Sequence, residues 1–138
     1  MKSPPFFTGR CISIHAITKQ AETFLEGLTE RERRDFEVAA TILDRSRERG
    51  RPPGGRSERV AGSKHGLFEL RITPPGRRGR HTRALFIAEG KEILVVRGVR
   101  KAQRGIPRGE IVLADRAASE YRRERDEGIG EEERGEEA

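Results

Sequence analysis

Arginine is the residue type whose positions in this sequence could form a binding site. Arg71, Arg83 and Arg97 each fall in, or at the end of, an apolar run typical of a central strand, and Arg100 and Lys101 directly follow the last of these runs. Bringing several positive charges together is unfavourable unless they bind an anion. A guanidinium can hold a phosphate through two parallel hydrogen bonds without losing its proton. These residues therefore predict a phosphate-binding site on a sheet.

The register of the strands decides which way these side chains face. A two-residue turn at Gly90 and Lys91 predicts a hairpin in which Arg83 lies opposite Gly98. In that register Arg83 and Arg97 point to opposite faces of the sheet, so only one of them belongs to a given site.

The alternation of side chains along its strand places Arg71 on an open face of the sheet. It points away from the side of its strand that carries Phe68 and Leu70. The predicted site therefore pairs Arg71 with Arg83 and with the corner at 100–101.

The positions of apolar residues predict two helices near the start of the chain. Residues 21–28 carry apolar side chains at steps of three and four, which is typical of a short amphipathic helix. Thr29 and Glu32 match the capping box that begins a helix, and Gly50 ends the segment. Because almost no linker separates the two helices, we expect a helical hairpin, preceded by a short strand at 11–14.

The rest of the chain alternates strands and turns before a last helix. Strands are predicted at 67–72, 82–88 and 92–99, and a helix is predicted to begin near Pro107. The apolar stripe of that helix consists of Ile111, Ala114, Ala118 and Tyr121. The predicted fold class is α+β, with the N-terminal helical hairpin packed on a twisted, mostly antiparallel sheet and followed by a C-terminal helix.

Charge is distributed unevenly along the 138 residues. The formal net charge is +6, but the segment 126–138 holds seven acids and one base, so residues 1–125 carry +12. We expect one domain over 1–125 and a disordered acidic tail over 126–138, because the tail has almost no apolar residues to bury. A strongly basic domain attracts polyanions, and nucleic acid is the expected partner.

Several other functions are excluded by motifs that the sequence lacks. It contains no G-x-S-x-G, no Walker glycine loop and no H-E-x-x-H. Cys11 is the only cysteine, and the three histidines lie in separate segments, so we expect no metal ion and no cofactor. No apolar run reaches the roughly 18 residues of a membrane span, and the start does not resemble a secretory signal, so we expect a cytoplasmic protein with no membrane partner.

Four segments together resemble one known family. They are 66–71 (GLFELR), 82–86 (TRALF), 93–101 (ILVVRGVRK) and 107–111 (PRGEI), the last followed by Ala114 and Arg116. In their order and spacing they are similar to the RelE/ParE superfamily of toxins, and most similar to its HigB-like branch, which is related to phage-derived host-killing proteins. The resemblance covers residues 21–121 and implies a RelE-like fold.

The resemblance implies the toxin of a type II toxin-antitoxin system. Members of this branch cleave messenger RNA, usually on the ribosome, by activating a ribose 2′-hydroxyl against the adjacent phosphate without a metal ion. By this resemblance Arg83 binds the scissile phosphate, while Arg71 and Lys101 line the same concavity. Arg100 is expected to contact the flanking backbone. Further RNA contacts are expected from Arg97, Lys64, Arg78 and Arg80.

The resemblance leaves two candidates for proton transfer. Family members use Lys, Tyr, His or Glu, and this chain has no histidine near the end of the last predicted strand, so Lys101 and Tyr121 are the candidates. Tyr121 also belongs to the apolar stripe, which fits a core residue with a satisfied hydroxyl. Leu67 and Glu69 occupy strand positions that are basic in the best-known RelE members.

Two alternative functions remain open. One is the ParE-like mode, in which the same fold inhibits DNA gyrase without cutting RNA. The other is an inactive family member that binds nucleic acid harmlessly. A toxin is expected to pair with a cognate antitoxin, commonly a helix-turn-helix protein in this branch, which covers the basic concavity, and to act on the ribosome and its mRNA. A further hypothesis is that the acidic tail competes for that concavity.

Overall fold

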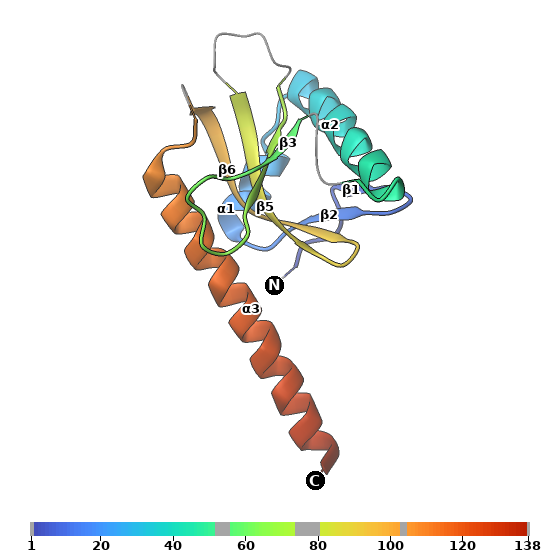
Figure 1. Ribbon diagram of the computed structural model, residues 1–138, viewed down its shortest axis with the longest axis vertical. Coiled ribbons are helices and arrows are strands. Elements are labelled where there is room, and N and C mark those ends of the chain that lie inside the picture. The colour runs from blue at the N-terminus through green and yellow to red at the C-terminus, as the bar shows by residue number, and fades with distance from the viewer. Residues whose placement is uncertain (1, 52–55, 74–80, 103–104, 138) are drawn as a thin grey trace.

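The computed structural model describes residues 2–51, 56–73, 81–102 and 105–137 (Figure 1). Within these residues the protein is α+β, with three helices and one six-stranded mixed sheet. The elements in chain order are β1 (Phe7–Thr8), β2 (Ser13–Ala16), α1 (Lys19–Glu26), α2 (Glu30–Glu48), β3 (Ser57–Arg59), β4 (Phe68–Arg71), β5 (His81–Glu89), β6 (Glu92–Ala102) and α3 (Arg108–Glu137).

The sheet is open, with the strand order β1-β2-β6-β5-β4-β3. Neighbouring strands are antiparallel except β2 and β6, which run parallel. The mostly antiparallel sheet and its three central strands are therefore confirmed, whereas the first predicted strand lies two residues later than expected. β1 and β3 were not predicted, because strands of two and three residues are too short to show a periodic pattern.

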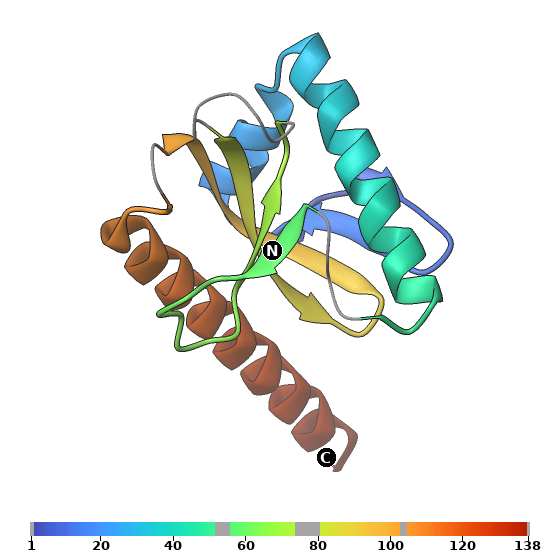
Figure 2. The same ribbon diagram turned by 45° about the horizontal axis from the view of Figure 1, so that its top comes forward.

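Helices cover both faces of the sheet (Figures 1 and 2). α1 and α2 pack on one face, over a core that includes Phe24, Phe36 and Phe86. α3 packs on the opposite face, where Ala114 and Ala118 belong to a buried cluster with Leu85, Leu94 and other side chains of the sheet. The two N-terminal helices and the C-terminal helix are thus confirmed, and they lie on different sides. α1 packs mainly on β6 and α2 on β4, so the closely packed helical hairpin that we predicted is not observed in the described part of the chain. None of the described helices is long and apolar enough to cross a membrane.

Side-chain caps begin both N-terminal helices. The hydroxyl of Thr18 accepts the Ala21 amide at 3.0 Å at the start of α1. At α2 the Thr29 hydroxyl accepts the Glu32 amide at 3.1 Å, and the Glu32 carboxylate accepts the Thr29 amide at 3.0 Å. These reciprocal bonds satisfy amides that have no partner within the helix, and they confirm the predicted capping box.

A β-bulge changes the facing of the strand arginines. The register of β5 and β6 shifts midway along their pairing, where β6 contains one extra residue. Because side chains alternate along a strand, one extra residue reverses the facing of those beyond it. Arg83 therefore lies opposite Val99 rather than Gly98, and Arg97 lies opposite Leu85. The prediction that Arg83 and Arg97 face opposite sides is wrong, since both are on the α3 face.

α3 is longer than the sequence suggested. The segment 126–138, for which we predicted disorder, continues the helix as far as Glu137, and α3 extends well past the sheet (Figure 1). Glutamate and arginine are good helix formers, and lengthening an existing helix avoids the cost of nucleation. Arg122 and Arg125 bind Glu89 of β5 at 2.8 and 3.0 Å and fasten the helix just before this segment.

Candidate nucleic-acid interface

Four charged side chains from three neighbouring strands form a row on the α3 face of the sheet. Glu58 of β3 lies opposite Glu69 of β4, and Arg71 of β4 lies opposite Arg83 of β5. We call these four residues the arginine–glutamate ladder. The register brings them together, because directly opposed residues have Cβ atoms about 5 Å apart on one face.

Ion pairs connect the ladder from strand to strand. Arg71 Nη2 is 3.9 Å from Glu58 Oε2, and Arg71 Nε is 3.8 Å from Glu69 Oε1. Arg83 Nε is 3.9 Å from Glu69 Oε2. Two opposed glutamates repel each other, and Arg71 offsets this repulsion by lying close to both. The 3.9 Å distance between Arg83 and Glu69 is too long for a hydrogen bond, so the guanidinium of Arg83 keeps hydrogen-bonding capacity for another acceptor.

Arg83 is the most deeply buried member of the ladder. Its side chain is 7% exposed, and among the described residues its Nε and Nη1 atoms are buried without a hydrogen-bond partner. A buried polar group without a hydrogen bond costs roughly 1–3 kcal/mol. Such a group is uncommon in native structures and requires an explanation. An anion that accepts these N–H groups would supply one.

Exposure of the ladder increases toward the edge of the sheet. The side chains of Arg83 and Glu69 are at most 10% exposed, that of Arg71 is 28% exposed and that of Glu58, on the edge strand, is 65% exposed. A ligand therefore meets Glu58 and Arg71 first and Arg83 last.

Arg97 lies on the same face as the ladder but is used structurally. Its guanidinium forms a hydrogen-bonded ion pair with Glu110 in the first turn of α3. An acidic residue in the first turn is also favoured by the helix dipole. The pair therefore fastens the start of α3 to β6.

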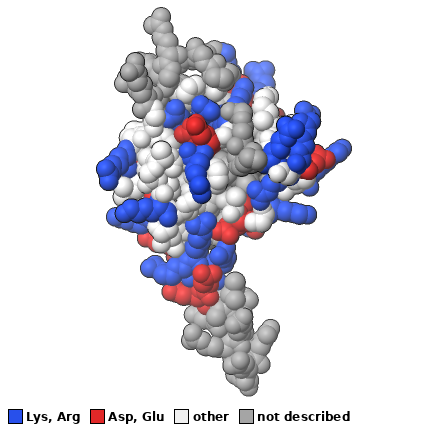
Figure 3. Space-filling model, viewed as in Figure 1, with Lys and Arg blue, Asp and Glu red and all other residues white. Residues whose placement is uncertain are grey.

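Positive charge is not confined to the ladder. Lys and Arg side chains are spread across the face shown in Figure 3, with Asp and Glu side chains among them. The interface is thus defined by the geometry of the ladder and not by an isolated basic patch.

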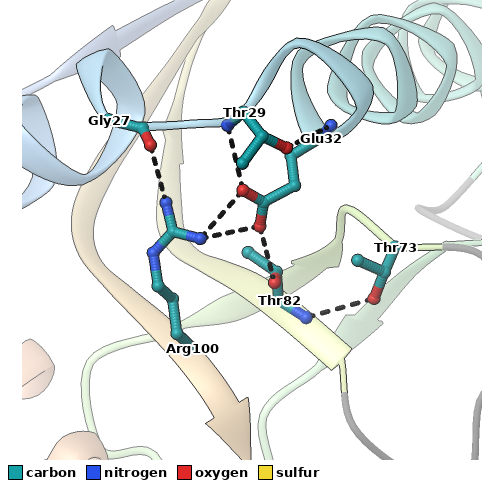
Figure 4. A network of polar contacts seen from close by, with 6 residues as sticks. All are labelled: Gly27, Thr29, Glu32, Thr73, Thr82 and Arg100. Atoms are coloured by element: carbon teal, nitrogen blue, oxygen red, sulfur yellow. Dashed lines mark hydrogen bonds and ion pairs between the residues drawn. The ribbon is translucent and has the colours of Figure 1, made fainter.

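Arg100 does not join the predicted site. Its guanidinium lies on the opposite face, where Nη1 donates to both carboxylate oxygens of Glu32 at 2.9 and 2.7 Å and Nη2 donates to the Gly27 carbonyl at 3.0 Å (Figure 4). It also lies 5.3 Å above the ring of Phe24. The β-bulge causes this difference, because it turns Arg100 away from the face of Arg83.

Three of the predicted site residues have side chains that cannot be placed. Lys101 follows Arg100 in β6, but its side chain is outside the described part, and Arg78 and Arg80 are outside the described residues altogether. Their predicted roles stay predictions.

Lys64 and Tyr121 lie away from the ladder. Lys64 belongs to the connection between β3 and β4, where its amide binds Asp115 of α3 at 3.0 Å. Tyr121 packs against the core under α3. It is eleven residues beyond Glu110, which corresponds to about 17 Å along the helix. The structure therefore favours the core interpretation of Tyr121 over a catalytic one.

Two acidic residues near the site were not predicted. Glu58 lies in a strand of three residues that has no recognisable pattern. For Glu110 the only signal in the sequence is the preference of acidic residues for the first turn of a helix. Glu69 was noted only as a departure from the family, although its two-residue spacing from Arg71 places both on one face.

The contacts of Glu32 predict an acid-sensitive contribution to stability. Burial by itself would raise the pKa of Glu32. Hydrogen bonds from Arg100, Thr29 and Thr82 outweigh it and lower the pKa from 4.5 to about 2. A pKa that is lower in the folded state gives stability that is present above pH 4.5 and is lost as the pH falls toward 2.

Glu32→Gln should therefore be less stable than the parent at pH 6, on the order of 1–2 kcal/mol, because the 40% exposure of Arg100 leaves part of the attraction screened. Thermal unfolding between pH 6 and pH 2 should show the two proteins converging with acidification. A constant difference across this range would contradict the assigned pKa.

Comparisons of the chain with protein-family models, with curated proteins and with solved structures found no match. Within the described residues, no group of three or more His, Cys, Asp or Glu side chains is placed to hold a metal ion. The chemistry available at the ladder is that of guanidinium and carboxylate groups.

Proposed function

We propose that this protein is the toxin of a type II toxin-antitoxin system, of the HigB-like branch of the RelE/ParE superfamily with a RelE-like fold, and that it cleaves mRNA on the ribosome in the cytoplasm. The observation that supports this most is the buried, incompletely hydrogen-bonded guanidinium of Arg83 beside Arg71. A cognate antitoxin, the ribosome and mRNA are the proposed partners.

A phosphodiester is the ligand that fits the ladder best. One of its non-bridging oxygens would accept a hydrogen bond from Arg83 once the phosphate displaces the groups that cover it, while the charge of Arg71 attracts the phosphate from the more exposed side. Charge-assisted bonds of this kind are stronger than neutral ones. Glu69 keeps the two guanidinium groups in place before the ligand arrives. Fixed donors that meet the charge developing on the phosphate stabilise the transition state.

The proposed reaction uses the RNA itself as nucleophile. The 2′ oxygen attacks phosphorus, the bond from phosphorus to the 5′ oxygen breaks, and the products are a 2′,3′-cyclic phosphate and a 5′-hydroxyl. Glu58 is the candidate acceptor of the 2′-hydroxyl proton, because its exposed carboxylate lies 3.9 Å from Arg71 at the open end of the ladder. Lys101 is the candidate donor of a proton to the departing 5′ oxygen, on the resemblance alone.

Arg83→Met separates loss of function from loss of folding. We expect this variant to lose growth arrest and to cleave mRNA on ribosomes at least about 100-fold more slowly. Its stability should be unchanged or higher by about 1 kcal/mol, because methionine fills the buried site without unpaired N–H groups and Glu69 keeps Arg71. Growth curves, primer extension on cellular mRNA and denaturant unfolding measure the three quantities.

The matched control is Arg34→Met, which changes an exposed arginine of α2 and should leave arrest and cleavage intact. Glu58→Gln should retain RNA binding while cleavage falls. A stable Arg83→Met protein that still arrests growth and cleaves mRNA would contradict the proposal.

A second candidate function is inhibition of DNA gyrase in the ParE-like mode. The carboxylate of Glu69 between Arg71 and Arg83 favours it, because this charge opposes the approach of phosphate, whereas binding to a protein needs no reacting groups. Blocked supercoiling with intact mRNA in arrested cells would select this mode. An absence of arrest at every expression level would select the inactive member that only binds nucleic acid.

A further inference from the structure

A second surface of the molecule combines unpaired cations with exposed aliphatic side chains. A hollow of about 610 Å³ lies between the β3–β4 connection and the first turns of α3. Its lining includes the apolar residues Ile106, Ile111 and Val112. None of the four ladder residues lines this hollow, so an inference about it stands apart from RNA cleavage.

The rim of this hollow is basic. Lys64, Arg108 and Arg116 line it, and among the described residues none of the three has an ion-pair partner. Asp115 also lines the hollow, but its carboxylate accepts hydrogen bonds from Ser63 and from the amides that follow it in the connection. Asp115 therefore holds the connection against α3 and does not neutralise the three cations.

The same surface exposes large apolar side chains. Val112 of α3, which lines the hollow, is 48% exposed, and its neighbour in sequence, Leu113, which does not line it, is 43% exposed. Only one other large apolar residue in the described part, Val38 on α2, is as exposed. Exposed aliphatic groups beside unpaired charges are typical of a surface that a partner covers.

We propose that this hollow binds an acidic, aliphatic peptide segment of a partner protein. The cations at the rim complement carboxylates, and Val112 with its neighbours complements leucine or isoleucine side chains. Single-stranded RNA fits less well, because its binding depends on aromatic stacking, and among the described residues of the lining His65 is the only one with an aromatic ring.

A direct test uses a fluorescein-labelled synthetic helix that carries glutamates on one face and leucines on the other. Fluorescence anisotropy with the full-length protein should show saturable binding with a Kd on the order of 10 μM. The double variant Lys64→Glu/Arg116→Glu should weaken binding at least about tenfold, and Val112→Ser should weaken it separately.

The control Arg31→Glu/Arg34→Glu makes the same change of charge on exposed residues of α2 and should bind the peptide as the parent does. Arg83→Met should also bind normally, so that failure here and failure of the proposed RNA cleavage are distinguishable. A single cooperative thermal unfolding transition in every variant shows that each is folded.

Three outcomes would overturn the proposal. The first is an absence of saturable binding, and the second is binding that the Lys64→Glu/Arg116→Glu variant does not weaken. The third is assignment of the hollow to another occupant. Labelled single-stranded RNA that loses affinity in this variant would assign it to RNA, and a dimer in sedimentation that the variant abolishes would assign it to a second copy of the chain.

Discussion

Gly98→Ala is expected to destabilise the protein by at least about 3 kcal/mol. A Cβ atom at Gly98 would lie 1.9 Å from Cγ of Phe24, so it would overlap with the aromatic ring. The ring cannot move away freely, because it is buried in the core and the guanidinium of Arg100 lies over it. α1 would have to separate from β6, which would also break the two 2.8 Å hydrogen bonds between the Gln20 side chain and the Gly98 backbone.

Denaturant unfolding of Gly98→Ala and Gly109→Ala measures this effect against a matched control. Nothing lies within 4 Å of a Cβ atom at Gly109 in the first turn of α3, so alanine there should be neutral or stabilising by up to about 1 kcal/mol. Similar stabilities for the two variants would show that α1 does not pack on β6 as described.

Asp44→Ala is expected to cost about 3–4 kcal/mol. The buried carboxylate of Asp44, on α2, accepts the amides of Arg10, Cys11 and Ile12 at 3.1, 2.7 and 2.9 Å. Alanine would leave three amides of the β1–β2 turn without these bonds. Each bond to a charged group contributes about 1.5–3 kcal/mol, and water that hydrogen-bonds to the exposed amides in the variant would recover part of this loss. The turn would then separate from α2.

Chemical denaturation can compare this variant with two others. Asp44→Asn keeps one carbonyl acceptor and should fall between the parent and Asp44→Ala. Asp35→Ala removes a carboxylate from the same helix that makes no hydrogen bond or ion pair among the described residues, so it should be close to neutral. Equal losses for Asp44→Ala and Asp35→Ala would contradict the role assigned to Asp44.

The parts of the fold that were predicted correctly depend on short-range patterns. The capping box of Thr29 and Glu32 and the apolar stripes of the helices lie within a few residues of one another. The role of Asp44 could not be predicted in this way, because its partners are more than thirty residues earlier in the chain. The helical continuation of α3 carries no apolar periodicity, and only the helix propensity of its glutamates and arginines favours it.

The candidate site was predictable in part for the same reason. Alternation along the strand was sufficient to predict the face on which Arg71 lies, and the pairing of β4 with β5 places it opposite Arg83. The positions of Arg97 and Arg100 depend on a bulge of one residue, which no motif marks in the sequence. The position of Glu58 beside Glu69 depends on a short edge strand, whose pairing is decided by tertiary contacts.

The parallel pairing of β2 with β6 has a consequence for how the chain acquires its shape. The paired residues Ser13 and Glu92 are about 80 positions apart, so the contact order of the sheet is high and closing this loop carries a large entropic penalty. During synthesis β2 cannot pair with β6 until the chain has been made as far as β6, at residues 92–102 of 138. The N-terminal segment is therefore expected to dock late, and folding should be slower than for a protein of this size built from local contacts.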